Sequence, residues 1–229
     1  MDDKNSLCKD FCQAQPLLIA HLEAVLLQNK TMNLTSINNL EAGKVLHIMD
    51  SLAVLPEVNA APEGTMADLG SGAGYPGIPL AITSGRDTTL IEANKKKARF
   101  LQGFLDAHDL SGKISVAAMR SEELAKSQRG KFAVVTARAV AELPILLELA
   151  APLLIQGGHF LALKGKPDTE ELVRGDTAAG AVGMEYLQTR DCSTSDSKTQ
   201  RCVLVYKRTK EPSLDLPRRP GMAAKRPLA

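Results

Sequence analysis

Three alternate glycines are the clearest chemical feature of this 229-residue chain. Gly70, Gly72 and Gly74 follow a short apolar stretch that ends at Leu69. Glycine lets the backbone turn tightly and approach a ligand closely, and the helix expected next would present unpaired N–H groups. The loop therefore predicts a nucleotide-type cofactor. Tyr75 stands where the dinucleotide fingerprint requires a third small residue, which disfavours a dehydrogenase.

Glu92 comes directly after the next apolar stretch, 18 residues beyond Gly74. A carboxylate at this spacing can accept hydrogen bonds from both hydroxyls of a ribose, and each such bond contributes about 1.5 to 3 kcal/mol. The alternative is that Glu92 only caps the helix expected to begin near Lys95. Both interpretations fit the spacing.

Polar residues also follow the third and fourth apolar stretches. Ser121 and Glu122 follow the third, where an adenine edge would lie, although the same residues are typical of the start of a helix. Arg138 follows the fourth and offers a fixed positive charge with five donors. Ligands of doubly wound sheets bind outside the carboxyl ends of the strands, so we expect these residues to share one crevice.

Strands and helices alternate from about residue 65, which predicts an α/β fold with a mostly parallel sheet covered on both faces. The end differs, because residues 184–189 and 201–207 are expected to form an antiparallel hairpin joined by a polar segment without a helix. The expected strands and helices are 65–69, 76–83, 88–91, 95–108, 114–117, 132–136, 142–154 and 158–163.

Residues 1–64 are expected to form a helical region in front of the α/β domain at 65–210. Apolar spacing predicts a helix over 6–30 with a break near Pro16, and a second helix after a capping box formed by Asn38 and Glu41. His47, Asp50 and Ser51 fall opposite its apolar face, where solvated and functional roles are both open. The turn residues of 56–64 predict a linker.

The charge is uneven along the chain, whose net value is +2. Residues 198–229 hold nine Lys or Arg against two acidic residues, a balance of +7, so the preceding part carries −5. This indicates a polyanionic partner. Residues 211–229, a basic and proline-rich tail, are expected to be extended or disordered. The basic run Lys95–Arg99 fits a phosphate-facing surface or simply a solvated helix face.

Composition excludes several classes of protein. No stretch approaches the roughly 18 apolar residues of a membrane span, and the N-terminus is not a signal peptide, so we expect a cytoplasmic protein without a membrane partner. The four cysteines show no C-x-x-C pair and are expected to be free thiols. We expect no metal site and a monomeric chain.

Several motifs together resemble one family. The acidic-x-Gly-x-Gly-x-Gly pattern from Asp68 to Gly74 is similar to the first motif of class I S-adenosylmethionine methyltransferases. Combined with further segments, it resembles the RsmG (GidB) family of bacterial 16S ribosomal RNA guanine-N7 methyltransferases. Those segments are 33–35, 47–52, 68–80, 138–139, 163–165 and 217–228.

The resemblance implies a Rossmann-like class I fold, S-adenosyl-L-methionine as cofactor, and 16S ribosomal RNA or the small ribosomal subunit as partner. It also implies which residues form the site, while leaving the catalytic residue unassigned. The cofactor residues implied by the resemblance are Gly70, Tyr75, Ser121, Glu122 and Arg138. The glycine motif adds Asp68 and Gly72, and the spacing after that motif adds Glu92. The implied positioning residues are Arg138, Lys164, His47 and Asp50.

The chemistry supports a ring-nitrogen target. Guanine N7 carries a lone pair and no proton, so methylation requires positioning rather than a general base. The segment Thr136–Ala139 lacks the Asn-Pro-Pro-Tyr type of motif used on exocyclic amines and the cysteine used on pyrimidine C5. Two alternatives stay open: a methyltransferase acting on a small molecule, and an RNA- or nucleotide-binding module without catalysis.

Overall fold

A sheet of seven strands runs through the centre of the computed structural model, which describes residues 3–193 and 200–229, with side chains from residue 14. The strands are β1 (Met66–Leu69), β2 (Thr88–Ile91), β3 (Ile114–Ala117), β4 (Phe132–Arg138), β5 (Leu154–Lys164), β6 (Met184–Asp191) and β7 (Cys202–Arg208). Their spatial order is β3-β2-β1-β4-β5-β7-β6.

The first five strands are parallel, and β7 is antiparallel to both β5 and β6. The mostly parallel sheet and its antiparallel hairpin are therefore confirmed. Because β2 and β3 extend to one side of β1 while β4 and β5 extend to the other, the order in which strands are added to the sheet reverses between β1 and β4. The carboxyl ends of these two neighbouring strands form the topological switch point, where ligands of such sheets bind.

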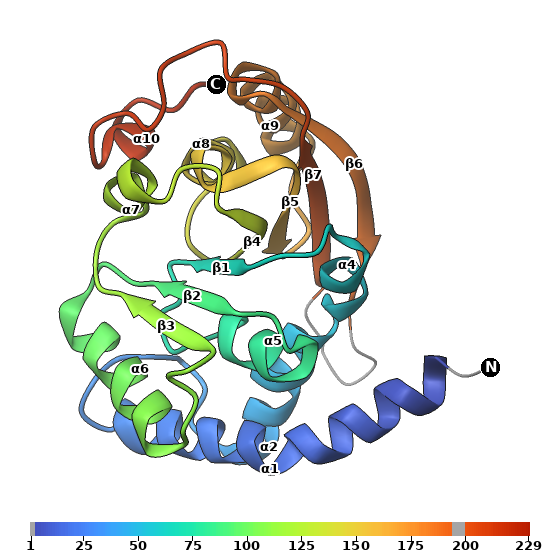
Figure 1. The fold of residues 1–229 in the computed structure, drawn as a ribbon, viewed down its shortest axis with the longest axis vertical. Coiled ribbons are helices and arrows are strands. Elements are labelled where there is room, and N and C mark those ends of the chain that lie inside the picture. Colours follow the sequence, from blue (N-terminus) through green and yellow to red (C-terminus); the bar gives the residue numbers. More distant parts are fainter. Residues whose placement is uncertain (1–2, 194–199) are drawn as a thin grey trace.

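Helices cover both faces of the sheet (Figure 1). They are α1 (Asp3–Asn29), α2 (Leu40–Gly43), η1 (Lys44–Met49), α3 (Asp50–Leu52), α4 (Leu55–Ala60), α5 (Gly77–Ser84), α6 (Lys95–Ala107), α7 (Ser121–Ser127), α8 (Leu143–Ala150), η2 (Ala151–Leu153), α9 (Thr169–Val182) and α10 (Met222–Lys225).

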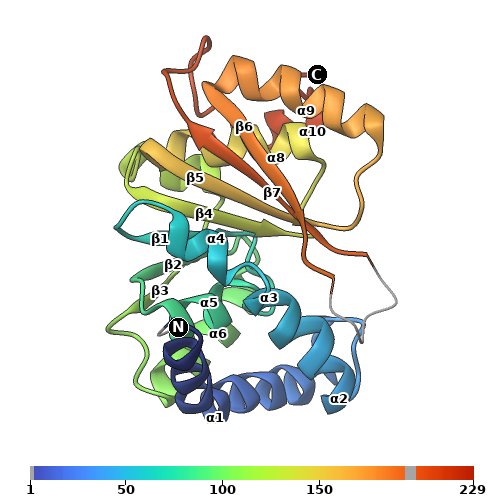
Figure 2. The same ribbon diagram turned by 90° about the vertical axis from the view of Figure 1, so that its right-hand side faces the viewer.

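Two buried clusters join these helices to the sheet. One packs α4, α5 and α6 against one face, with completely buried Ile78 and Leu101. The other packs α7, α8 and α9 against the opposite face, with completely buried Leu147 and Phe160. Figure 2 shows α1 along the side of the first face, farthest from α9 and α10. The sheet is thus apolar on both sides, as its parallel strands require.

Helix α1 continues through Pro16, so the expected break is wrong. Proline removes one backbone hydrogen bond and costs about 3 kcal/mol inside a helix. The helix is continuous but bends along its length (Figure 2), and after Pro16 its residues Leu18, Leu22 and Val25 are almost completely buried in a cluster with Ile48 and the glycine loop. Burial of each such side chain contributes about 1.5 to 3 kcal/mol.

The second expected helix is shorter and less regular than predicted. Its cap is Asn39 rather than Asn38, since the Asn39 side chain accepts from Ala42 N at 2.8 Å. The chain then forms one π-helical segment, η1, before α3. Wide turns of this kind are frequent at functional sites. This one carries His47 towards the glycine loop and leads directly into Asp50.

The expected linker at 56–64 is also wrong, because α4 occupies its first part and packs on the sheet. Val58 is completely buried. The Arg86 guanidinium donates to four carbonyl oxygens of this segment, those of Pro62, Gly64, Val58 and Ala61, at 2.7 to 3.1 Å. A single side chain on the domain therefore holds the connection in place.

Helix α9 was not expected, because Thr169–Val182 holds two glycines and few large apolar residues. Its small residues permit close packing instead: a Cβ at Gly175 would collide with the Leu143 side chain of α8. Asp168 caps the helix by accepting from Glu171 N at 2.7 Å. Contacts across the fold therefore select a helix that local pattern does not favour.

The tail at 211–229 is ordered, so the expectation of disorder is wrong. Leu216 is 1% exposed, α10 follows it, and Arg218 forms an ion pair with Glu148 of α8. Hydrophobic burial and this ion pair return the tail to the sheet domain. Cys192 and Cys202 are free thiols, whereas the side chains of Cys8 and Cys12 lie outside the described part.

No helix within the described residues combines the length and apolar character needed to cross a membrane. Over the same part of the chain, no group of three or more His, Cys, Asp or Glu side chains has a metal-binding arrangement.

Candidate active site

The glycine loop connects the end of β1 to the start of α5 at the switch point of the sheet. Gly70, Gly72 and Gly74 have φ values of +70°, +57° and +97°, a region that residues with a Cβ rarely adopt. A Cβ at Gly70 would lie 2.7 Å from Val140. The predicted need for glycine is therefore explained by backbone conformation and by close approach together.

Asp68 holds this loop from beneath. Its carboxylate is completely buried, accepting from Thr136 Oγ1 at 2.8 Å through Oδ1 and from Gly77 N at 3.3 Å through Oδ2. Burial raises the pKa of Asp68 to about 6, although the hydrogen bond from Thr136 opposes that shift. Asp68 therefore shapes the loop and does not face the crevice.

Glu92 ties the loop to the end of β2. Its Oε2 accepts from Gly72 N at 2.8 Å, and its Oε1 accepts from Asn94 N at 2.7 Å. Asn94, not Glu92, caps α6, because its side chain accepts from Lys96 N and Lys97 N. The alternative in which Glu92 only caps that helix is thus wrong, and Glu92 lines the crevice beside the glycines.

A cavity of about 380 Å³ opens above the glycine loop, and we call it the loop cleft. Its volume is in the range of small-molecule sites. Its lining residues come from the loop, from the ends of β2 and β4, from the segment before α2, and from η1 and α6. They are Leu34, Thr35, Ser36, His47, Gly70, Ser71, Gly72, Ala73, Tyr75, Glu92, Lys97, Arg138, Ala139 and Val140.

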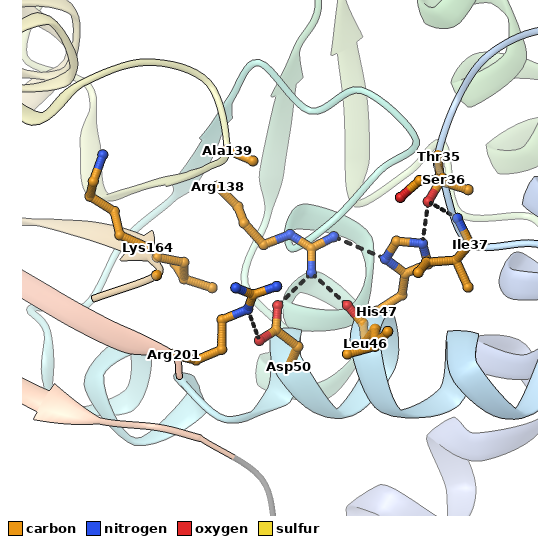
Figure 3. A pocket seen from close by; sticks show the side chains of 12 residues that line it. Thr35, Ser36, Ile37, Leu46, His47, Asp50, Arg138, Ala139, Lys164 and Arg201 are labelled. Atoms are coloured by element: carbon orange, nitrogen blue, oxygen red, sulfur yellow. Dashed lines mark hydrogen bonds and ion pairs between the residues drawn. The ribbon is translucent and has the colours of Figure 1, made fainter. Parts of the chain in front are cut away.

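A second cavity of about 490 Å³ adjoins the loop cleft, and we call it the arginine pocket. It is lined by Thr35, Ser36, Ile37, Leu46, His47, Asp50, Arg138, Ala139, Leu163, Lys164, Gly165 and Arg201 (Figure 3). Five residues line both cavities, and the largest of these is Arg138. Arg138 therefore stands in the wall between them.

Arg138 is held by several partners. Nη1 donates to Asp50 Oδ2 at 2.7 Å and to Leu46 O at 3.2 Å, while Nη2 lies 3.3 Å from His47 Nδ1. Its guanidinium carbon lies 5.5 Å from the centre of the Tyr75 ring, within cation–π range. A planar donor group with this many contacts has one orientation only.

Asp50 receives a second arginine. Arg201, directly before the second strand of the C-terminal hairpin, donates from Nε to Oδ1 at 3.1 Å (Figure 3). The Asp50 side chain is 9% exposed, so one buried carboxylate balances two guanidinium groups and leaves this cluster with a net positive charge. The sequence left both a solvated and a functional role open for His47 and Asp50. Both side chains are buried and line the arginine pocket.

His47 is neutral at physiological pH. Burial, followed by the charge of Arg138, lowers its pKa to about 4. Arginine can only donate, so Nδ1 is the acceptor and Nε2 carries the proton that faces Thr35 Oγ1 at 2.9 Å. The imidazole stacks on Tyr75 with ring centres 4.5 Å apart and planes 11° apart. Tyr75 thus has a stacking role beneath the crevice.

Lys164 lies at the edge of the arginine pocket, with its ammonium turned away from Arg138 (Figure 3). Its Nζ donates to Ala141 O at 3.1 Å and pairs with Glu171 of α9 at 2.7 Å. Glu171 also accepts from Leu143 N at 2.8 Å. In this conformation Lys164 joins α9 to the loop after β4.

Ser121 and Glu122 begin α7 and lie apart from the two cavities above. Both are buried and line a smaller cavity of about 150 Å³ beside the loop cleft. Ser121 does not cap the helix: Arg120 is the cap residue, and its N–H donates to Glu123 Oε2 at 3.0 Å. Glu122 Oε1 accepts from Gly221 N of the tail at 2.7 Å.

Comparison with protein families decides between the possibilities raised by this geometry. A family model described as GidB, rRNA small subunit methyltransferase G, matches residues 14–201. The chain belongs to the GidB family. The match spans the N-terminal helices, the loop cleft and the arginine pocket.

Curated relatives agree with this membership. Ribosomal RNA small subunit methyltransferase G of Desulfitobacterium hafniense is 36% identical, over 87% of this chain and 83% of that protein. The protein of the same name from Staphylococcus carnosus is 35% identical, over 87% and 85%. The one from Chloroflexus aggregans is 36% identical, over 91% and 87%.

Solved structures with low identity share the fold of this GidB chain. TYW2 of P. horikoshii, in complex with MeSAdo, superposes with a TM-score of 0.56 at 14% identity, over 70% of this chain and 62% of that one. Geranyl diphosphate methyltransferase, in complex with GPP and sinefungin, gives 0.54 at 13%, over 76% and 81%.

Two residues of this GidB site escaped prediction from sequence. Arg201 was assigned only to a strand, because its role depends on Asp50, from which it is 151 residues distant. His21 lies on α1, completely buried, with Nε2 2.9 Å from Ala73 O of the glycine loop. Its place among apolar residues of α1 gave no sign of that contact. Both depend on long-range packing.

Proposed function

We propose that this GidB family member is a cytoplasmic, monomeric enzyme that transfers a methyl group from S-adenosyl-L-methionine to N7 of one guanine in the 16S rRNA of the small ribosomal subunit. The observation that carries the proposal is the position of Arg138 between the loop cleft and the arginine pocket. A group can pass directly between two reactants, one in each cavity, only where the two cavities adjoin, and Arg138 lies at that place.

The loop cleft fits the cofactor. Its floor is the glycine loop, where a side chain at Gly70 would reach Val140, so backbone can lie close to a bound nucleoside. Glu92 lines the cleft with a carboxylate whose remaining lone pairs can accept from ribose hydroxyls. When bound there, S-adenosyl-L-methionine supplies an electrophilic methyl group on a sulfonium.

The arginine pocket fits the base. Thr35 and Arg138 offer polar groups close to its junction with the cleft, and the cluster of Arg138, Arg201 and Asp50 carries excess positive charge. Guanine presents two acceptors, N7 and O6, on one edge. A guanidinium can donate to O6 or to a phosphate while N7 keeps its lone pair free for the methyl group.

The chemistry needs position rather than proton transfer. The lone pair of guanine N7 forms the bond to the methyl carbon as the carbon–sulfur bond breaks, and the positive charge passes from sulfur to the guanine ring. No proton leaves during this step, so a neutral His47 and a paired Asp50 are compatible with it. The residues around Arg138 hold the two reactants in line.

Exposed basic residues support an RNA substrate. Lys95, Lys96 and Arg99 are exposed on α6, next to the loop cleft that Lys97 lines. Duplex RNA hides N7 in a deep, narrow groove, so the target guanine must be in a loop or turned out of its stack. With 3% aromatic residues, the protein has few stacking surfaces, and phosphate contacts supply much of the affinity.

The experiment is a deletion of the gene followed by mass spectrometric mapping of methylated guanines in 16S rRNA. We expect one N7-methylguanine to disappear, to return with the wild-type gene, and to stay absent with Arg138→Ala expressed at the same level. Unchanged rRNA methylation would overturn the proposal. Turnover on free nucleotides alone would indicate a small-molecule enzyme, and cofactor binding without any turnover a binding module.

A further inference from the structure

The C-terminal tail has no role in the function proposed above, although it is anchored next to the cofactor cleft. We infer that its segment Gly221–Ala224 forms one wall of the adenine subsite, and that the ion pair between Arg218 and Glu148 holds this wall in place. The inference rests on the proposed function, because it takes adenine to be part of the ligand.

The small cavity at the start of α7 has two sides that come from distant parts of the chain. Gly221, Ala223 and Ala224 of the tail form one side. The opposite side belongs to the sheet, at the carboxyl ends of its first strands. Gly70 and Val140 line both this cavity and the loop cleft, so the two spaces are neighbours.

The lining of the small cavity suits a purine base. Most of it is apolar, with Ile91 and Met119 on the sheet side and the alanines of α10 on the tail side. Arg120, Ser121 and Glu122, at the start of α7, provide the polar and charged groups of the lining. Glu92, at the proposed ribose position, follows the neighbouring strand β2. Adenine fits this cavity because it is a flat, largely apolar ring with one polar edge, and because the ribose attached to it would lie near Glu92.

Three contacts fasten the tail there. Leu216 is 1% exposed in the core beneath α8. Arg218 Nε donates to Glu148 Oε1 at 2.6 Å, and the Glu148 side chain is 3% exposed. The Gly221 N–H donates to Glu122 Oε1 at 2.7 Å, which joins the tail directly to the proposed adenine edge.

The competing role for this tail is contact with RNA phosphates, which its basic composition favours. The two roles divide between adjacent arginines. Arg218 is engaged by Glu148 within the fold, whereas Arg219 is exposed. Replacing either removes the same charge, so Arg219→Ala is a matched control for Arg218→Ala.

The test is calorimetric titration of the full-length wild type, Arg218→Ala and Arg219→Ala with S-adenosylmethionine and with S-adenosylhomocysteine. We expect Arg218→Ala to raise both Kd values at least about fivefold, which corresponds to roughly 1 kcal/mol, and Arg219→Ala to leave them unchanged. Equal Kd values for all three proteins would overturn the inference. If the wild type bound neither compound, the proposed function would fail instead.

A second variant guards against a merely structural effect of Arg218→Ala. Ala224 is exposed and lines the small cavity, so Ala224→Trp fills the space without entering the core. We expect it to weaken binding of both cofactor forms at least about fivefold, with Tm within the error of the wild type. Unchanged cofactor affinity with this variant would contradict the inference that Gly221–Ala224 forms one wall of the adenine subsite. Weaker RNA binding in both arginine variants, at constant cofactor Kd, would assign the tail to RNA.

Discussion

Arg138 donates to Asp50 across 2.7 Å, joining the end of β4 to α3 over 88 residues of sequence. The same carboxylate accepts from Arg201 at 3.1 Å. One buried side chain therefore fixes three segments: the N-terminal helices, the central sheet and the C-terminal hairpin. The wall between the loop cleft and the arginine pocket depends on this arrangement.

Replacing Asp50 with Asn should destabilise the fold as well as the site. Removal of one partner from a buried ion pair costs about 3 to 5 kcal/mol, and the 31% exposure of the Arg201 side chain reduces this to about 2 to 3 kcal/mol. Urea unfolding measures the change. The matched control is Glu41→Gln, which breaks the exposed pair with Lys44 and should cost less than about 1 kcal/mol. Equal losses in both variants would contradict the role of Asp50.

Replacing Glu92 with Gln should weaken cofactor binding about 10- to 100-fold, because a charged acceptor contributes about 1.5 to 3 kcal/mol per hydrogen bond. The amide can accept from only one of the backbone N–H groups of Gly72 and Asn94, and it loses the charge facing the cleft. Calorimetry with S-adenosylmethionine measures the effect. An unchanged Kd would remove Glu92 from the ribose site and leave it a support of the loop.

Two glycines with nearly equal positive φ values separate strain from function. Gly70 has φ +70° and Gly85 has φ +69°, but a Cβ would meet Val140 at Gly70 and nothing within 4 Å at Gly85. Alanine at either position should cost about 1 to 2 kcal/mol through backbone strain, and at Gly70 the contact with Val140 adds to that cost. Only Gly70→Ala should also weaken cofactor binding. Comparable binding losses in the two variants would assign the effect to general destabilisation.

Asp68 should make stability depend on pH. Its folded pKa of about 6 exceeds its ordinary value of 3.8, so the folded state binds the proton more tightly. Its contribution is therefore fully present below pH 3.8 and is lost as pH rises through 6.

Asp68→Asn does not titrate. The free energy of unfolding of this variant minus that of the wild type should therefore rise by about 2 kcal/mol from pH 4.5 to pH 7.5. Denaturant titration at both pH values measures the difference, in which the other titrating groups cancel. A difference independent of pH would show that the Asp68 carboxyl is not perturbed by burial.

The features that sequence predicted well are local. The glycine loop is recognisable because its residues must adopt positive φ values. Glu92 directly follows β2, and Arg138 is the last residue of β4. In a parallel sheet the carboxyl ends of strands share one edge, so position along the chain is enough to bring such residues together.

The features that sequence missed depend on distant partners. In the sequence pattern, His47 and Asp50 look like part of a solvated helix face. In the folded chain they contact Arg138, and Asp50 also contacts Arg201. Helix α9 packs closely on α8 because Gly175 has no side chain to collide with Leu143. The ion pair between Arg218 and Glu148 helps to hold the tail against the domain. None of these pairs is recognisable from spacing, since each joins elements whose contact is known only from the fold.

The most direct test is single-turnover methyl transfer from labelled S-adenosylmethionine to purified small ribosomal subunits, followed by identification of the methylated nucleoside. Wild-type protein should yield N7-methylguanosine at one site. Arg138→Ala and Arg138→Lys should each lose about 10²-fold in rate, because an ammonium cannot keep the planar set of contacts to Asp50, Leu46 and His47. Wild-type rates in both variants, or a methyl group on any other atom, would contradict a transfer positioned by Arg138.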